Sequence, residues 1–202
     1  MPGWSHTGPC GPAASTPSSV ISTKPTSERK EANMIGELEK TGSRWQLRFR
    51  RELAHPPQRV WQALTETDEL RKWFPDQIVV GEWKVGAKLK FQDANAKMQP
   101  FDGEVLACAP PSLLEFRWGS DTIRFEVAAR ESGSTLTLID TIDELGKAAR
   151  DGAGWHVCLD ALEHALDGTD APSMPEQWSA VHEDYVKKFG PEASTIGPPK
   201  GW

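Results

Sequence analysis

The sequence predicts an α+β fold in which a curved antiparallel sheet of about seven strands wraps around one long C-terminal helix. Two observations carry this prediction. Between residues 77 and 143, six short segments rich in β-branched and aromatic residues alternate with turn residues, a pattern typical of an antiparallel meander. Residues 147–166 then space their apolar side chains as an amphipathic helix does. A first strand and two short helices precede the meander.

The first strand is predicted over residues 44–53, where apolar and polar side chains alternate. Trp45, Leu47 and Phe49 share one face of this strand, and the polar residues between them share the other. Arg51 falls in the apolar register. It either reaches solvent at the strand end or faces inward, and an inward arginine needs a partner because an isolated buried charge is costly.

Two short helices are predicted after the first strand. Pro56 and Pro57 suit the first turn of a helix, where no backbone N–H is required. The second helix covers roughly residues 68–73 and stops before Pro75, because a proline inside a helix removes a hydrogen bond and clashes with the preceding turn.

Six consecutive strands are predicted next, joined by Gly, Pro, Asp and Ser residues that suit hairpin turns. Short connections between successive strands indicate antiparallel neighbours. The first strand is expected to join the edge of this sheet. The six segments cover residues 77–85, 87–93, 101–109, 112–119, 121–131 and 134–143.

The long helix is predicted over about residues 147–166, with Gly168 as its C-cap. His156, Asp160 and His164 are predicted to lie away from its apolar stripe. Their i, i+4 spacing would suit metal ligands on one helix, but a solvated polar face is the favoured interpretation because the sequence offers no further ligand nearby. The apolar stripe consists of Trp155, Cys158, Leu159, Leu162, Ala165 and Leu166.

The two ends of the chain differ from its middle. Residues 1–33 are rich in Pro, Gly, Ser and Thr and are predicted to be a disordered tail, since such a segment buries too little apolar surface to offset its ordering entropy. Met34 is a candidate for the true start of the protein. The domain is predicted over residues 34–170, and residues 171–202 form a C-terminal extension with one short helix and a frayed end.

Composition excludes several classes of protein. The chain has 202 residues and a formal net charge of −6 without a cluster of basic residues, which argues against nucleic acid as a partner. No apolar run approaches the ~20 residues of a membrane span. Cys10, Cys108 and Cys158 are widely spaced, so no structural metal site is predicted and a reduced, cytoplasmic protein is expected. Cys158 is interpreted as a small buried hydrophobe, since no base lies nearby in the helix.

The order of these segments resembles the START-like helix-grip superfamily (SRPBCC), which includes Bet v-like proteins. Within it, the chain is similar to the family of the activator of heat shock protein 90 ATPase, in that activator's C-terminal domain. The similarity covers about residues 45–168 and rests on the order and spacing of five segments. They are "HPPQRVWQALTETDELRKWF", "VGAKLKF", "DGEVLACAPPSLLEFRW", "GSTLTLIDTID" and "GWHVCLDALEHAL".

The resemblance implies a ligand-binding cavity between the sheet and the long helix. Filling of the same space by a packed core is the alternative, because protein interiors are close-packed by default. Trp73 and Phe74 either belong to the core or form a lid at the cavity mouth. Arg51 and Asp140 would either pair with each other or orient a polar group of a ligand. The candidate lining is Phe49, Arg51, Phe91, Phe101, Phe116, Trp118, Phe125, Leu138, Asp140, Trp155, Cys158, Leu159 and Leu162.

Three functions remain open, in order of preference. The first is binding of a hydrophobic small molecule in the cavity. The second, implied by the family name, is regulation of the heat shock protein 90 ATPase as a co-chaperone. The third is an enzyme such as a cyclase or hydratase, for which convergent acid and base groups would be needed. No catalytic residue, cofactor or metal is assigned, and no membrane or nucleic-acid partner is expected.

Overall fold

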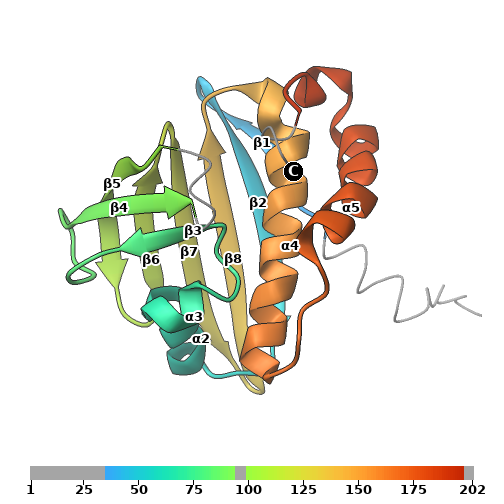
Figure 1. Cartoon of the computed structure of the whole chain (residues 1–202). Helices are drawn as coiled ribbons and strands as arrows, with labels where there is room; N and C mark the ends of the chain where they lie inside the picture. The colour runs from blue at the N-terminus through green and yellow to red at the C-terminus, as the bar shows by residue number, and fades with distance from the viewer. Residues whose placement is uncertain (1–34, 94–98, 198–202) are drawn as a thin grey trace, which may run out of the picture.

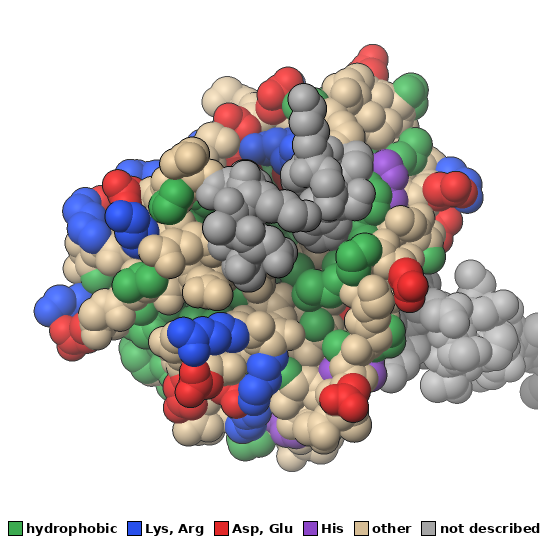
Figure 2. Space-filling model, viewed as in Figure 1, with side chains coloured by type: hydrophobic (Ala, Val, Ile, Leu, Met, Phe, Trp, Pro, Cys, Tyr) green, Lys and Arg blue, Asp and Glu red, His purple; other side chains and the backbone are tan. Residues whose placement is uncertain are grey.

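The computed structural model describes residues 35–93 and 99–197. The tail predicted for residues 1–33 lies outside them. One antiparallel sheet curves around a long C-terminal helix (Figure 1), so the predicted fold class is confirmed. Basic and acidic side chains are interspersed on the face seen in Figure 2.

The sheet has eight strands, one more than the sequence suggested. They lie in the order β1-β2-β8-β7-β6-β5-β4-β3. The additional strand, β1, pairs with β2 at the sheet edge. It carries a single large apolar residue, Leu38, so it lacks the alternation that reveals a strand in a sequence. The strands are β1 Glu37–Thr41, β2 Arg44–Leu53, β3 Asp76–Val79, β4 Lys88–Asp93, β5 Phe101–Ala109, β6 Leu113–Trp118, β7 Asp121–Arg130 and β8 Gly133–Ile142.

The helices follow the predicted order. Gly168 ends α4 with a φ of 68°, as expected for a C-cap. The second short helix is shorter than predicted and continues as turns up to Trp73. None of the helices in the described part of the chain is long and apolar enough to cross a membrane. The helices are α2 Pro57–Thr65, α3 Thr67–Leu70, η1 Leu145–Lys147, α4 Ala148–Asp167, α5 Met174–Phe189 and η2 Pro191–Ser194.

Helix α4 is covered on two sides, by the sheet and by α5 (Figure 1). Tyr185 of α5 is fully buried against Gly152 of α4, where a Cβ atom would lie 2.7 Å from the tyrosine ring. The prediction of an exposed His156 is therefore wrong, because α5 covers that face and leaves the residue 8% exposed.

The end of the extension is packed rather than frayed as far as it is described. The backbone N–H of Ile196 donates to the carbonyl oxygen of Gly146 at 3.0 Å. This contact joins the segment after η2 to the start of the long helix, where η1 precedes α4.

Candidate functional site

An aromatic cluster fills the space between the sheet and α4. Phe74 lies at its centre, with its ring centroid 5.7 Å from that of Trp155 and 6.1 Å from those of Phe116 and Trp118. Tilted and edge-on ring contacts of this kind are favourable beyond the burial of their area. The cluster comprises Phe74, Phe91, Phe101, Phe116, Trp118 and Trp155.

The structure brings the predicted apolar lining residues together in one interior. Phe101 and Trp118 are half-buried at the edge of this interior. The others are at most 3% exposed, so most of their surface contacts other side chains. These buried residues are Phe49, Phe91, Phe116, Phe125, Leu138, Trp155, Cys158, Leu159 and Leu162.

The two residues predicted at the cavity mouth are both buried. The Trp73 indole N–H donates to the carbonyl oxygen of Ala63 at 2.9 Å, which fixes this ring against α2. Phe74 has no regular element of its own, because it follows the turns after α3 and precedes Pro75 and β3. A loop residue therefore supplies the ring at the centre of the aromatic cluster.

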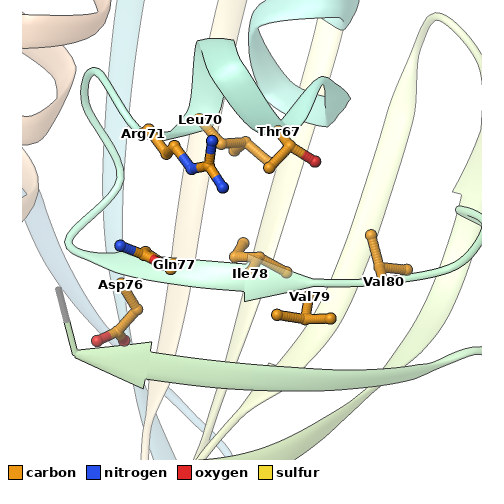
Figure 3. Close-up of a pocket in the computed structure, with 8 residues that line it drawn as sticks. All are labelled: Thr67, Leu70, Arg71, Asp76, Gln77, Ile78, Val79 and Val80. Atoms are coloured by element: carbon orange, nitrogen blue, oxygen red, sulfur yellow. The ribbon is translucent and has the colours of Figure 1, made fainter. Parts of the chain in front are cut away.

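A surface pocket of about 210 Å³ lies between α3 and β3. Figure 3 shows Thr67, Leu70 and Arg71 on the α3 side and the β3 residues opposite them. The pocket shares no residue with the predicted lining. Its two sides are joined by the chain segment 72–75, which carries Phe74 inward. The lining is Thr67, Leu70, Arg71, Asp76, Gln77, Ile78, Val79 and Val80.

Two indole groups of the aromatic cluster are hydrogen-bonded to carboxylates. Trp118 Nε1 donates to Asp76 Oδ2, and Trp155 Nε1 donates to Asp140 Oδ2, each at 2.8 Å. The two indole centroids are 5.5 Å apart. The interior thus combines an apolar ring surface with two carboxylates that accept hydrogen bonds from its indoles.

A carboxylate cluster lies beside Trp155 at the start of α4. It consists of Asp121 on β7, Asp140 on β8 and Asp151 on α4, whose oxygens approach one another within 4.8 Å. Burial, followed by the negative charges of the other two carboxylates, raises the pKa of Asp140 well above its usual value. Lys147 Nζ lies 2.8 and 2.7 Å from the two oxygens of Asp121.

Sequence reasoning found only Asp140 of this cluster. Asp121 follows a turn and Asp151 lies in the first turn of a helix, where acidic residues are common for local reasons. The sequence carries no signal that three elements bring these side chains together. The donor set would suit a hard cation in its oxygen chemistry, but the Lys147 ammonium group already provides a positive charge there.

Arg51 faces inward but does not pair with Asp140. Its guanidinium lies 3.3 Å from Asp160 Oδ1 and 3.1 Å from Glu163 Oε1, both on α4. Arg51 is opposite Leu136 on β8, four residues before Asp140. At ~3.4 Å per residue this separation is about 13 Å, too far for a direct contact.

A second polar network joins α4 to α5 and β1. Gly36 N–H donates to the Tyr185 hydroxyl oxygen at 2.9 Å, and that hydroxyl lies 3.1 Å from His156 Nδ1. His156 Nε2 lies 3.5 Å from Asp160 Oδ2. The tyrosine hydroxyl accepts from the glycine, and the histidine tautomer sets the direction of its hydrogen bond to His156. Burial lowers the pKa of His156.

Comparison with known proteins agrees with this architecture. Residues 54–167 match the family model described as activator of Hsp90 ATPase homolog 1-like protein. The chain belongs to this family. The predicted resemblance to the helix-grip superfamily is thereby confirmed. No curated protein matches the chain significantly.

Solved structures of low sequence identity share the fold. A conserved protein of unknown function from Enterococcus faecalis, EF2215, is 17% identical, with a TM-score of 0.63 over 80% of this chain and 98% of that one. CalU16 from Micromonospora echinospora is 21% identical, with a TM-score of 0.61 over 76% and 98%. NE0264 from Nitrosomonas europaea is 25% identical, with a TM-score of 0.52 over 61% and 94%.

Proposed function

We propose that this protein binds an apolar small molecule in the aromatic cluster between the sheet and α4. The observation that carries the proposal is the position of Phe74. Its ring occupies the centre of the cluster, yet it belongs to the connection between α3 and β3 rather than to a helix or strand. Loops open at lower free-energy cost than core strands and helices do, so this ring can give way to a ligand.

The surface pocket supports an entry route. Leu70 and Arg71 border it on one side and Asp76 on the other, and these residues flank the segment that carries Phe74. A movement of this segment toward solvent would join the pocket to the interior. Displacement of the Phe74 ring would then expose an aromatic-lined space to the incoming ligand.

The two hydrogen-bonded indoles support binding of a ligand with one polar group. Asp76 and Asp140 lie behind Trp118 and Trp155, which fixes the orientation of both rings. The apolar faces of the rings would supply most of the affinity, and the carboxylates of Asp76 and Asp140 would set the orientation of the ligand. Such a role requires neither a cofactor nor a metal ion.

Titration with indole and naphthalene as apolar probes tests the proposal. Both should raise the melting temperature of the wild-type protein, with an effect that grows with probe concentration. Phe74→Ala should strengthen binding at least ~10-fold, because the competing ring is removed and an apolar cavity remains. Leu47→Ala creates a cavity at a fully buried position of β2 and serves as the matched control. Absence of binding to the wild type, or equal gains in both variants, would refute the proposal.

Regulation of the Hsp90 ATPase is a second candidate, favoured by the name of the family. One structural feature supports it: β3 is an edge strand, and its Val79 is 54% exposed. Exposed sheet edges can pair with a strand of a partner. A stimulated Hsp90 ATPase rate that Val79→Lys abolishes would support this function. An unchanged ATPase rate with the wild-type protein would dismiss it.

A further inference from the structure

The carboxylate cluster contains two buried oxygens without a donor. Among the described residues, Asp140 Oδ1 and Asp151 Oδ2 have no hydrogen-bond partner. Their sister oxygens are satisfied, since Asp140 Oδ2 accepts from the Trp155 indole and Asp151 Oδ1 accepts from Arg150 Nε at 2.6 Å. A buried acceptor without a donor costs about 1–3 kcal/mol, so two of them in one cluster need an explanation.

The charges around these oxygens also fail to balance. Asp143 adds a fourth carboxylate, 2.8 Å from Lys147 Nζ. Against these acids, the described residues of β2, η1 and α4 that reach the cluster supply three cations. The four acids are Asp121, Asp140, Asp143 and Asp151, and the three cations are Arg44, Lys147 and Arg150. If every group were ionised, one negative charge would remain in a buried site.

A bound metal ion fits this arrangement poorly. Lys147 Nζ contacts both oxygens of Asp121, so a metal ion would share that carboxylate with an ammonium group. A divalent ion would also reverse the imbalance, since two positive charges would meet one excess negative charge. One proton corrects the charge and gives the cluster an O–H donor, which an ionised carboxylate lacks.

We propose that Asp140 keeps a proton at neutral pH and donates it through Oδ1 to Asp151 Oδ2. The pair then acts as a pH-sensitive latch that joins β8 to the first turn of α4. Loss of the proton at alkaline pH would leave two ionised carboxylates within 4.8 Å of each other and loosen the start of α4. This inference does not depend on the proposed ligand site.

The titration has a defined sign. The pKa of Asp140 in the folded protein lies above its ordinary value of 3.8, so the folded state holds a proton that the unfolded state releases. The stability contribution of Asp140 is therefore fully present below about pH 4 and is lost as the pH rises toward the pKa of the folded state.

Asp140→Asn tests the latch directly. The asparagine amide can donate to Asp151 while its oxygen accepts from Trp155, so it imitates the protonated acid at every pH. The melting temperature of this variant should match the wild type near pH 4 and exceed it by a margin that grows as the pH rises toward the pKa of Asp140 in the folded protein. Asp68→Asn removes a carboxylate whose side chain is 90% exposed and lies outside the cluster. It is the control and should show no such growing gain.

Infrared spectroscopy gives an independent readout. At pH 7 the wild type should show the carbonyl stretch of one protonated carboxyl group, and Asp140→Asn should lack it. Asp151→Asn should also lose the band, because its amide can donate to an ionised Asp140. Absence of the band in the wild type would overturn the proposal. So would a stoichiometric metal ion in native mass spectra.

Discussion

Two titratable side chains point from the sheet toward α4, and their surroundings differ. Arg51 on β2 meets the carboxylates of Asp160 and Glu163, so its charge is compensated. Asp140 on β8 accepts one hydrogen bond from Trp155, while its other oxygen meets no donor among the described residues. Arg51 is 3% exposed and Asp140 is 0% exposed, so burial does not distinguish them. Their partners do.

The difference separates a structural role from a chemical one. A buried charge with matched partners holds elements together, and removing one member leaves the others uncompensated. A buried carboxyl group with an unsatisfied oxygen can take up a proton or a ligand atom instead. On this basis the ion pairs of Arg51 hold the middle of α4 against the sheet. Asp140, beside the start of α4, is the residue proposed to bind and release a proton. Four predictions test or refine this contrast.

The largest effect is expected for Arg51→Ala. It leaves Asp160 and Glu163 without their shared cation and removes a buried side chain, which should lower the free energy of unfolding by about 3 kcal/mol. Urea denaturation measures this loss. Arg50→Ala is the control, because the Arg50 side chain is 59% exposed and should cost less than ~0.5 kcal/mol. If Arg51→Ala lowers the free energy of unfolding by less than ~1 kcal/mol, Arg51 does not anchor α4.

Leu162→Trp tests how tightly the interior between the sheet and α4 is packed. Leu162 is fully buried on α4, so the larger ring should overpack the interior and lower the free energy of unfolding by ~1–3 kcal/mol. If the Phe74 ring moves aside for the new tryptophan instead, the loss of stability should be small. The tryptophan would then fill the proposed site, and the indole and naphthalene probes should no longer bind. Denaturation and probe titration on the same variant separate these outcomes. Strong destabilisation without any probe binding by the parent protein would favour a packed core.

His156→Gln should have a smaller, pH-dependent effect at the outer face of α4. Burial lowers the pKa of His156 below 6.5 in the folded protein. The unfolded protein therefore takes up a proton more readily, and stability is lost as the pH falls from 6.5 toward the pKa of the folded state. The neighbouring charges are Asp160, Arg51 and Asp184. Glutamine does not titrate, so the difference in unfolding free energy between about pH 7.5 and pH 5.5 should be smaller in the variant than in the wild type. An unchanged pH dependence would show that His156 does not control it.

The sequence was sufficient for the fold because its periodicities are strong. Alternation in β2 and the apolar stripe of α4 place Phe49 and Trp155 on the inner faces, whereas the alternation alone left the direction of Arg51 open. β1 escaped detection because its pairing with β2, rather than its own apolar pattern, makes it a strand.

The candidate site was only partly predictable. Arg51 and Asp140 stood out as polar residues in apolar registers, but their partners come from α4 and β7 through tertiary contacts. His156 was misplaced because the helix α5 that covers it lies far along the chain. A helical pattern shows which residues share a face, not how many faces the fold will cover.

The smallest effect is expected at Cys158, which lies on α4 between Arg51 and the carboxylate cluster. Burial raises the pKa of its thiol to about 12, so almost no thiolate forms at neutral pH and a thiol reagent should not label it in the folded protein. Cys108 is only half-buried and should react before Cys158. Mass spectrometry after timed labelling distinguishes the two. Cys158→Ala should cost about 0.5–1 kcal/mol. Rapid labelling of Cys158 would mean that α4 detaches from the sheet more readily than the Arg51 ion pairs and the Asp140–Asp151 latch allow.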